Sequence, residues 1–288
     1  MSRFHVRGVF WRHLLVFAIR NAPVWIEPLV VACWSLVFLL WGPGRRGVMH
    51  NLKAIKPGSW ALANFFRCYR VFWNYAWSLE ETTRFRELHT VPDWEFTGWQ
   101  HFETMEKSGG AILLTAHMGS YDIGAHLFAE NSTRRIVMVR APEVDPLTRE
   151  FEEARISERI RIAFNVNASD LALDLLHAIR DGGIVAIQGD RVTPGLSDIP
   201  ATLFGRPTRI PAGPFALAMA ARAPIHPMFI VRRGRRLYRL VACQPICVAS
   251  SRNRDAALSE AVAQWTRELE RVIQAAWYQW FMFEEMAA

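Results

Sequence analysis

Cysteine is scarce in this sequence, and its spacing fits no metal site or disulfide framework. The four cysteines are Cys33, Cys68, Cys243 and Cys247. Zinc sites and small disulfide-stabilised domains both need regular ligand or cysteine spacings, so the pattern argues against both. No second histidine or cysteine stands at a suitable spacing from His117, so a metal hydrolase is poorly supported. We expect reduced, structural cysteines, as in a protein that faces the cytosol.

The sequence also lacks a clear membrane-spanning run and a signal-peptide cleavage site. The uncharged stretch Pro28–Trp41 is shorter than the roughly 20 apolar residues that cross a bilayer. The residues that follow it, Gly42-Pro-Gly44, do not resemble the small-residue site at which signal peptides are cleaved. Three interpretations stay open for this stretch: insertion into one leaflet, a short tilted span, or a pair of helices buried in the protein.

Positive charge and tryptophan are abundant. The 288 residues carry a formal net charge of +7 and include 12 tryptophans. This charge favours an anionic partner, which can be a nucleic acid, a membrane surface or a phosphorylated substrate. Arginines recur through the apolar and aromatic residues 3–20, a pattern typical of segments that lie on anionic membranes. We expect membrane-associated helices in residues 1–44 and a catalytic domain in residues 45–288.

From residue 93 onward, apolar runs of strand length alternate with helical segments. Such alternation predicts an α/β fold with a mostly parallel central sheet flanked by helices, preceded here by the hydrophobic or amphipathic helical segment that anchors the chain to a membrane. The expected strands are 93–97, 111–116, 135–139, 184–187 and a hairpin of 225–231 with 237–242. The expected helices are 100–107, 120–130, 145–161, one from 169, 215–222 and 255–277, after aromatic-rich helices in 48–85. Residues 205–213 are expected to form a loop, and 232–236 an arginine-rich hairpin tip.

The stretch from Ala111 to Asp122 carries the first candidate chemistry. His117 follows the end of a buried strand, and Asp122 falls in the first turn of a helix that Ser120 is placed to cap. A carboxylate this close can hold one imidazole nitrogen and leave the other free to accept a proton. The sequence therefore predicts a general-base pair, His117 and Asp122. The alternative is a buried structural histidine beside a helix-capping acid.

Two further polar signals follow the ends of other strands. Arg140 comes directly after one strand, and Gly189-Asp-Arg191 after another. Ligand sites in parallel sheets gather beyond the carboxyl ends of the strands, so we expect these residues to meet His117 on one rim. Arg140 and Arg191 have forked donors suited to a phosphate, and Asp190 is placed to steady an arginine or His117. An exposed loop cation and a simple turn are the alternatives.

These motifs resemble a known family. His117-x-x-x-x-Asp122 is similar to the first block of the glycerolipid acyltransferase superfamily, and the layout resembles its bacterial lipid A branch, the lauroyl and myristoyl acyltransferases. Further matching pieces are Arg45-Arg46, Asn51-Leu52, Trp94–Gly98, Gly109–His117, Gly182–Ile187, Gln188–Arg191, Pro227 and Trp277–Trp280. The chain departs from the lipid A pattern in having Asp122 where glutamate is usual, and Glu284-Glu285 where the tail is usually basic.

The resemblance implies a membrane enzyme at the cytoplasmic face of a bacterial inner membrane. It would move an acyl chain from a thioester, carried by acyl carrier protein or coenzyme A, to a hydroxyl of a lipid A precursor or related glycolipid. The thioester is a co-substrate, and no cofactor, metal or nucleic acid is implied. His117 would deprotonate the hydroxyl, Asp122 would orient the imidazole, and Arg140 with Gly189, Asp190 and Arg191 would bind substrate. The aromatic helices would shelter acyl tails.

Other classes of function stay open at this stage. A thioesterase or hydrolase would use the same histidine with water as the acceptor. A non-catalytic membrane-binding protein would explain the charge but leave the three strand-end motifs without a role. The sequence does not identify the acceptor lipid, the length of the acyl chain, the donor or the oligomeric state.

Overall fold

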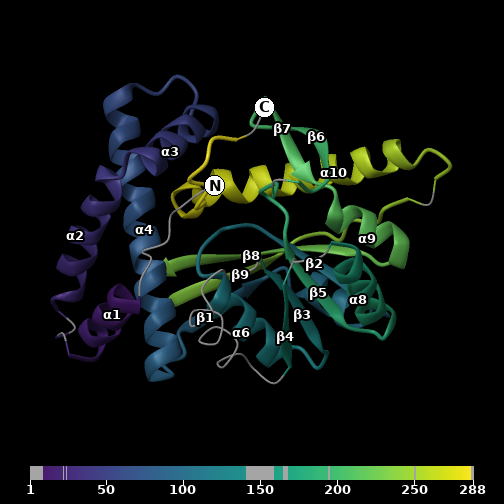
Figure 1. The fold of residues 1–288 in the computed structure, drawn as a ribbon, viewed down its shortest axis with the longest axis horizontal. Coiled ribbons are helices and arrows are strands. Elements are labelled where there is room, and N and C mark those ends of the chain that lie inside the picture. The colour runs from purple at the N-terminus through teal and green to yellow at the C-terminus, as the bar shows by residue number, and fades with distance from the viewer. Residues whose placement is uncertain are drawn as a thin grey trace.

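A seven-stranded sheet forms the centre of the protein (Figure 1). The computed structural model describes residues 9–21, 23, 25–140, 159–164, 168–193, 195–249 and 251–286. The strand order is β1-β9-β8-β2-β5-β3-β4. The strands are β1 Asp93–Thr97, β2 Ala111–Thr115, β3 Ile136–Arg140, β4 Ile160–Phe164, β5 Ile184–Gln188, β8 Ile225–Gly234 and β9 Leu237–Ala242. Every neighbouring pair is parallel except the hairpin of β8 and β9, which confirms the predicted, mostly parallel sheet.

Helices cover both faces of this sheet. The helices of the α/β part are α5 Trp99–Glu106, α6 Tyr121–Asn131, α8 Ala168–Arg180, α9 Gly213–Ala221 and α10 Arg254–Ala276. Strand residues such as Leu113 pack with α5 and α6, whereas their neighbours such as Ile112 pack with α8, α9 and α10. Burial on both faces explains why β2 and β5 are almost continuously apolar. On the α10 side, Phe229 and Trp265 stack with ring centroids 5.5 Å apart.

Within the described residues, four helices precede the sheet and form a layer at one end of it (Figure 1). They are α1 Val9–Asn21, α2 Glu27–Leu40, α3 Gly42–Ile55 and α4 Ala61–Leu88. A second core joins α2, α3 and α4, and Phe281 and Phe283 from the end of the chain complete it. By length and composition, no single helix of the described residues spans a bilayer. Only α2 and α3 together meet that test, and the chain bends by 88° between them.

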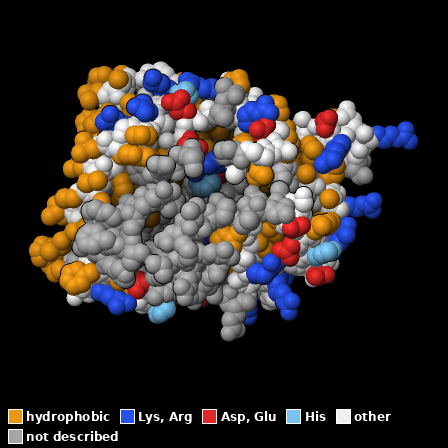
Figure 2. All heavy atoms as spheres, viewed as in Figure 1, with side chains coloured by type: hydrophobic (Ala, Val, Ile, Leu, Met, Phe, Trp, Pro, Cys, Tyr) orange, Lys and Arg blue, Asp and Glu red, His pale blue; other side chains and the backbone are white. Residues whose placement is uncertain are grey.

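An exposed apolar surface follows these helices. It consists of Phe17, Trp25, Leu29, Leu36, Val37, Leu40, Trp60, Leu62, Phe65 and Phe66. Trp25 and Leu40 are 78% and 77% exposed, and the hydrophobic side chains at the left edge of Figure 2 lie over α2. We call this set the apolar flank. Contiguous apolar surface of this kind marks an interaction site, because single exposed residues are normal but clusters are not.

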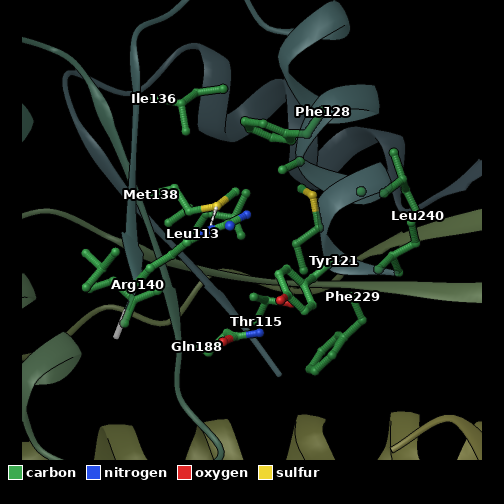
Figure 3. A pocket seen from close by; sticks show the side chains of 17 residues that line it. Leu113, Thr115, Tyr121, Phe128, Ile136, Met138, Arg140, Gln188, Phe229 and Leu240 are labelled. Carbon is green, nitrogen blue, oxygen red and sulfur yellow. Dashed lines mark hydrogen bonds between the residues drawn. The ribbon is translucent and has the colours of Figure 1, made fainter. Parts of the chain in front are cut away.

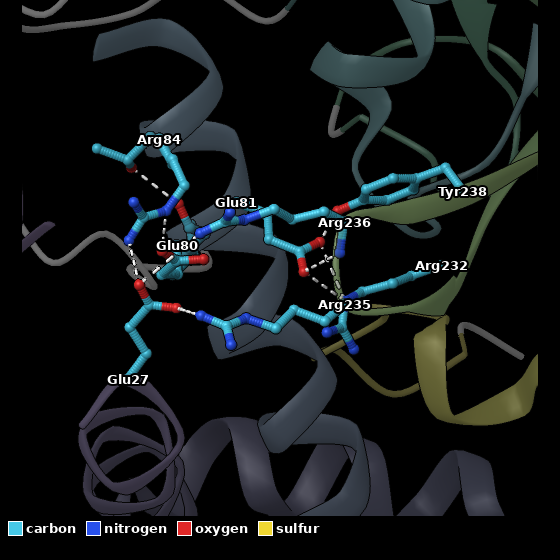
Figure 4. A network of polar contacts seen from close by, with 10 residues as sticks. Glu27, Glu80, Glu81, Arg84, Arg232, Arg235, Arg236 and Tyr238 are labelled. Carbon is cyan, nitrogen blue, oxygen red and sulfur yellow. Dashed lines mark hydrogen bonds and ion pairs between the residues drawn. The ribbon is translucent and has the colours of Figure 1, made fainter. Parts of the chain in front are cut away.

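The arginine-rich hairpin tip docks on the helical layer (Figure 4). Glu27 of α2 is bonded to Arg84 of α4 at 2.5 Å and also to Arg235 of the tip. Glu81 of α4 accepts from Arg232 Nε at 3.0 Å and from the hydroxyl of Tyr238. Arg232 and Arg235 of the tip are therefore paired with buried carboxylates of α4 and α2, respectively.

Two segments differ from the sequence-based expectation. The predicted helix 145–161 ends in a strand, since Ile160–Phe164 forms β4, and residues 145–158 lie outside the described residues. The predicted loop 205–213 belongs largely to a hairpin of β6 Asp198–Leu203 and β7 Arg206–Pro211. Phe204 and Gly205 form its turn with φ of 53° and 70°, as two-residue hairpin turns require. Its alternate apolar residues, Ile199, Leu203 and Ile210, are buried in the core that contains α10.

All four cysteines are free. Cys68 and Cys243 are buried, and burial raises the pKa of both thiols to about 12. Cys33 and Cys247 are exposed. The two buried cysteines therefore act as small apolar side chains in the core.

Candidate active site

The three strand-end motifs meet at one edge of the sheet. Strands β2, β5 and β3 are adjacent and parallel, so their carboxyl ends lie side by side. His117 stands two residues beyond β2, Asp190 stands two residues beyond β5, and Arg140 is the last residue of β3. This is the convergence that the alternating sequence predicts.

Asp190 holds the imidazole of His117. The Nδ1 atom of His117 lies 2.8 Å from Oδ1 of Asp190, and the backbone N–H of His117 donates to Oδ2 at 3.1 Å. The indole N–H of Trp280 donates to the same Oδ2 at 2.9 Å. The carboxylate of Asp190 is fully buried, whereas the side chain of His117 is 26% exposed. One carboxylate thus fixes both the ring and the backbone of the histidine.

Asp190 remains ionised in this environment. Burial alone raises the pKa of a carboxyl group, but the charge of His117, its hydrogen bond, Arg191 and the Trp280 indole together lower the pKa of Asp190 to about 2. An ionised carboxylate only accepts hydrogen bonds, so Nδ1 of His117 carries the proton and donates it. The lone pair of the neutral ring is then on Nε2, which has no hydrogen-bond partner among the described residues.

The turn that carries His117 is tied to the end of the chain. The backbone N–H of Phe281 donates to the His117 carbonyl at 2.8 Å, and that of Gly119 donates to the Gln279 carbonyl at 3.1 Å. Gly119 has φ of +57°, and a Cβ atom there would lie 2.4 Å from the carbonyl oxygen of Ile230. Only glycine fits both restrictions, so the turn places His117 rigidly beyond β2.

Asp122 does not form the expected contact with His117. Its carboxylate accepts from Arg86 of α4 at 2.8 Å and from Arg140 at the end of β3. The helix does begin where predicted, but Ser120 makes no side-chain cap. Its hydroxyl lies 2.5 Å from that of Thr82 instead. The carboxylate of Asp122 therefore pairs with two arginines from distant segments and not with His117.

Gly189 and Arg191 flank Asp190 in different ways. The N–H of Gly189 donates to the Thr115 carbonyl at 2.8 Å, and its carbonyl accepts from the indole of Trp265 at 3.0 Å. Gly189 thus aligns the Asp190 turn with β2. Arg191 donates to the Phe281 carbonyl at 3.3 Å, while its buried Nε has no hydrogen-bond partner among the described residues. A buried, unsatisfied donor of this kind is costly unless a ligand atom meets it.

An apolar pocket opens beside this rim, between α6 and the sheet (Figure 3). Its space, counting the open mouth, is about 660 Å³. Phe128 and Ile136 lie at one end, and Thr115 and Gln188 at the other, where β2 and β5 finish (Figure 3). No residue of α4 lines it, so this pocket gives no support to the expectation that the aromatic helices shelter acyl tails.

The arrangement suits proton transfer by an oriented histidine. Nδ1 is held by a buried carboxylate, Nε2 is available, and an apolar pocket for a substrate lies alongside. No group of three or more His, Cys, Asp or Glu side chains in the described part of the chain is placed to hold a metal ion. The residues at hand therefore supply acid–base chemistry with no side chain in the position of a nucleophile bonded to the base.

Two site residues escape prediction from the sequence. Trp280 lies 90 positions after the carboxylate that it contacts, and Arg86 lies 36 before Asp122. The stretch Trp277–Trp280 matches the family pattern, but the only signal for its contact with Asp190 is that a buried indole needs a hydrogen-bond acceptor. No local pattern points to Arg86, because it sits within a long helix among other charged residues.

Comparison with known protein families gives a match. The family model described as bacterial lipid A biosynthesis acyltransferase matches residues 71–286. This range contains the whole sheet, His117, Asp190 and Trp280, and it begins within α4. No curated protein sequence matches the chain.

Proposed function

We infer that this chain, which belongs to the family of bacterial lipid A biosynthesis acyltransferases, moves a fatty acyl chain from an acyl thioester to a hydroxyl of a lipid A precursor or related glycolipid. The acyltransferase assignment follows from family membership. One structural observation carries the chemistry, namely a histidine whose Nδ1 is held by buried Asp190 and whose Nε2 is available.

In the proposed reaction, Nε2 of His117 removes the proton of the acceptor hydroxyl. The hydroxyl oxygen attacks the thioester carbonyl carbon, and the tetrahedral intermediate collapses as the carbon–sulfur bond breaks. The thiol leaves with the proton that the imidazolium returns. Asp190 stabilises the imidazolium, since its ionised carboxylate is already placed against Nδ1. Positioned general-base catalysis contributes about 10²–10⁴-fold to the rate.

The pocket between α6 and the sheet is the proposed site for the acyl chain. Its wall is almost wholly apolar, and its strand-end side meets the rim that carries His117. Burial of each methylene contributes about 0.8 kcal/mol, so a fatty chain there binds without specific polar contacts. The donor, an acyl carrier protein or coenzyme A thioester, would place its reacting carbonyl at the pocket mouth.

Arg191 is the proposed ligand for a phosphate of donor or acceptor. Its buried Nε lacks a hydrogen-bond partner in the described part of the chain, and a guanidinium binds phosphate through forked donors. Arg140 borders the pocket, but Asp122 already engages its guanidinium. We therefore assign phosphate binding to Arg191 first and give Arg140 a role in shaping the pocket mouth.

The apolar flank is the proposed contact with the membrane, at the cytoplasmic face of the bacterial inner membrane. Exposed Trp25, Leu40 and Phe66 suit the boundary between headgroups and acyl chains. A flank inserted there brings the catalytic part of the chain to a membrane that contains the lipid acceptor. The part of the flank within residues 1–44, together with Phe66 of α4, would thus anchor the protein.

The test is mass spectrometry of the lipids made from labelled acyl-acyl carrier protein or acyl-coenzyme A and a lipid A precursor in vesicles. We expect a labelled acyl lipid from the wild type and a loss of about 10²-fold or more with His117→Ala. Release of labelled fatty acid alone would identify a thioesterase instead. Absence of product with both donors would reject the proposed transfer.

A further inference from the structure

We propose that Trp280 and the neighbouring residues 279–283 are a positioning element for the catalytic base. This inference rests on the proposed function, because it assigns a role within the same reaction. Trp280 would act through Asp190 without touching substrate. Its indole N–H would keep the carboxylate in the one orientation that holds the Nδ1–H form of His117.

The contacts of Asp190 show why a third donor matters. Oδ1 accepts a hydrogen bond from the imidazole of His117. Oδ2 accepts hydrogen bonds from the His117 backbone N–H and from the Trp280 indole N–H. Rotation of the carboxylate about its Cβ–Cγ bond would disturb all three contacts together. Trp280 is only 3% exposed, so its ring cannot swing away from Oδ2 without leaving the core. Hydrogen bonds to a charged group are the strong ones, about twice as strong as neutral ones.

The same segment also fixes the backbone on which His117 stands. Phe281 donates to the His117 carbonyl, and Gln279 accepts from Gly119. Met118, between them, forms a β-bridge with Trp280. One short segment therefore contacts the catalytic histidine through its backbone and its acid partner through a side chain.

The segment is anchored independently of the site. The side-chain amide of Gln279, which is 1% exposed, accepts from the Arg232 N–H at 2.6 Å and donates to the Arg232 carbonyl at 2.7 Å. Asn51 of α3 donates to the carbonyls of Met282 and Glu284 at 3.1 and 2.8 Å. Removal of the Trp280 N–H alone should therefore leave the path of the segment unchanged.

The test compares Trp280→Phe with Trp277→Phe in the full-length protein. Phenylalanine keeps an aromatic ring at position 280 but removes the donor to Asp190. Trp277 is a suitable control because it lies three residues earlier, and its indole N–H has no hydrogen-bond partner among the described residues. Steady-state kinetics give kcat and KM for acyl transfer. ¹⁵N NMR of histidine-labelled protein identifies the protonated ring nitrogen of His117, and thermal unfolding gives the melting temperature.

We expect Trp280→Phe to lower kcat about tenfold, the effect of losing roughly 1.4 kcal/mol of a charge-assisted hydrogen bond, with KM unchanged. The ¹⁵N spectrum should show a mixture of Nδ1–H and Nε2–H forms in place of the Nδ1–H form. Trp277→Phe should match the wild type in both. If Trp280→Phe unfolds, Trp280→His at the same position offers a ring N–H donor and should retain the Nδ1–H form.

Full activity of a folded Trp280→Phe with an unchanged ¹⁵N spectrum would overturn the inference while leaving the proposed function intact. A wild type that transfers no acyl chain would reject the proposed function, yet the NMR comparison would still decide whether Trp280 orients His117. A drop in kcat with an unchanged His117 spectrum would also contradict the inference, since the effect would then bypass the histidine.

Discussion

Asp122 accepts a hydrogen bond from Arg86 at 2.8 Å, although the two residues belong to different layers of the protein. Together with Arg140, this contact makes Asp122 a junction between α4, α6 and the end of β3. Asp190, by contrast, faces His117 directly. The two aspartates therefore have separable roles, and the same substitution at each should give different results.

Asp190→Asn should impair the chemical step, whereas Asp122→Asn should impair stability. Without the charge at position 190 nothing stabilises the imidazolium, so kcat should fall about 10²-fold or more with a smaller change in KM. Loss of the charge at position 122 leaves Arg86 and Arg140, 15% and 12% exposed, facing a neutral group. We expect a loss of about 2 kcal/mol in the free energy of unfolding, a value reduced for partial exposure.

Steady-state kinetics, urea unfolding and the ¹⁵N spectrum of His117 separate the two cases. Asp122→Asn should keep the Nδ1–H form of His117, because Asp122 makes no contact with the ring. If Asp122→Asn changed which ring nitrogen of His117 carries the proton, and Asp190→Asn did not, Asp122 and not Asp190 would orient the imidazole.

The ionisation of Asp190 gives a dependence of stability on pH. Its pKa is lowered in the folded protein to about 2 from the ordinary value of 3.8. A lowered folded pKa stabilises the protein above the unfolded value, and this contribution is lost as the pH falls through the folded value. Between about pH 4 and pH 2 the wild type should lose about 2 kcal/mol more than Asp190→Asn. Urea titrations of both proteins at several pH values measure this difference, and parallel curves would contradict the assignment.

The size of the pocket should select the acyl chain. Ala186 of β5 lines the pocket, so Ala186→Leu would add side-chain volume inside it. We expect the preferred donor to become shorter, with kcat/KM for the longest accepted chain falling about tenfold, the effect of one or two methylenes. Competition between donors of different length, read by mass spectrometry, tests this. Ala256→Leu on the exposed side of α10 makes the same change away from the pocket and should keep the wild-type preference.

The sheet and the rim could be predicted because their signals are local. Residues such as Ile112 and Val185 lie in short apolar runs, and parallel topology then brings the strand ends together. The partner of His117 could not be chosen from the sequence, since Asp122 is near in the chain and Asp190 is 73 residues away. Arg86, which binds Asp122, and Trp280, which binds Asp190, decide between the two aspartates. Both act through tertiary contacts that no sequence periodicity indicates.

The apolar flank should govern binding to membranes. Trp25→Glu with Leu40→Glu places two charges where we propose that the protein enters the lipid, and both side chains are more than three-quarters exposed. We expect at least a tenfold loss of binding to anionic vesicles, because burial of each large apolar side chain contributes about 1.5–3 kcal/mol. Sedimentation with vesicles measures the loss. Leu173→Glu, at a position 58% exposed on α8, is the control, and equal binding of all three proteins would remove the flank from the mechanism.

Glu81 should matter most for the union of the helical layer with the hairpin. Its carboxylate is 2% exposed, and both oxygens lie 3.0 Å from Nε of Arg232. Tyr238 and the N–H of Arg236 donate to it as well. Glu81→Gln keeps the shape but leaves Arg232 without a counter-charge in a mostly buried position. Breaking a buried ion pair on one side costs about 3–5 kcal/mol, which thermal unfolding would register as a lower melting temperature.

Glu81→Gln should also affect catalysis. The backbone N–H of Arg232 donates to the Gln279 side chain, and the Gln279 carbonyl accepts from the N–H of Gly119. We therefore expect a moderate fall in kcat at temperatures well below melting. Arg233→Gln is the control, since Arg233 pairs with Glu95 at the surface, 3.7 Å away. A Glu81→Gln protein with the wild-type melting temperature would mean that other contacts, such as the Glu27–Arg235 pair and apolar packing through Phe281, hold the helical layer against the sheet.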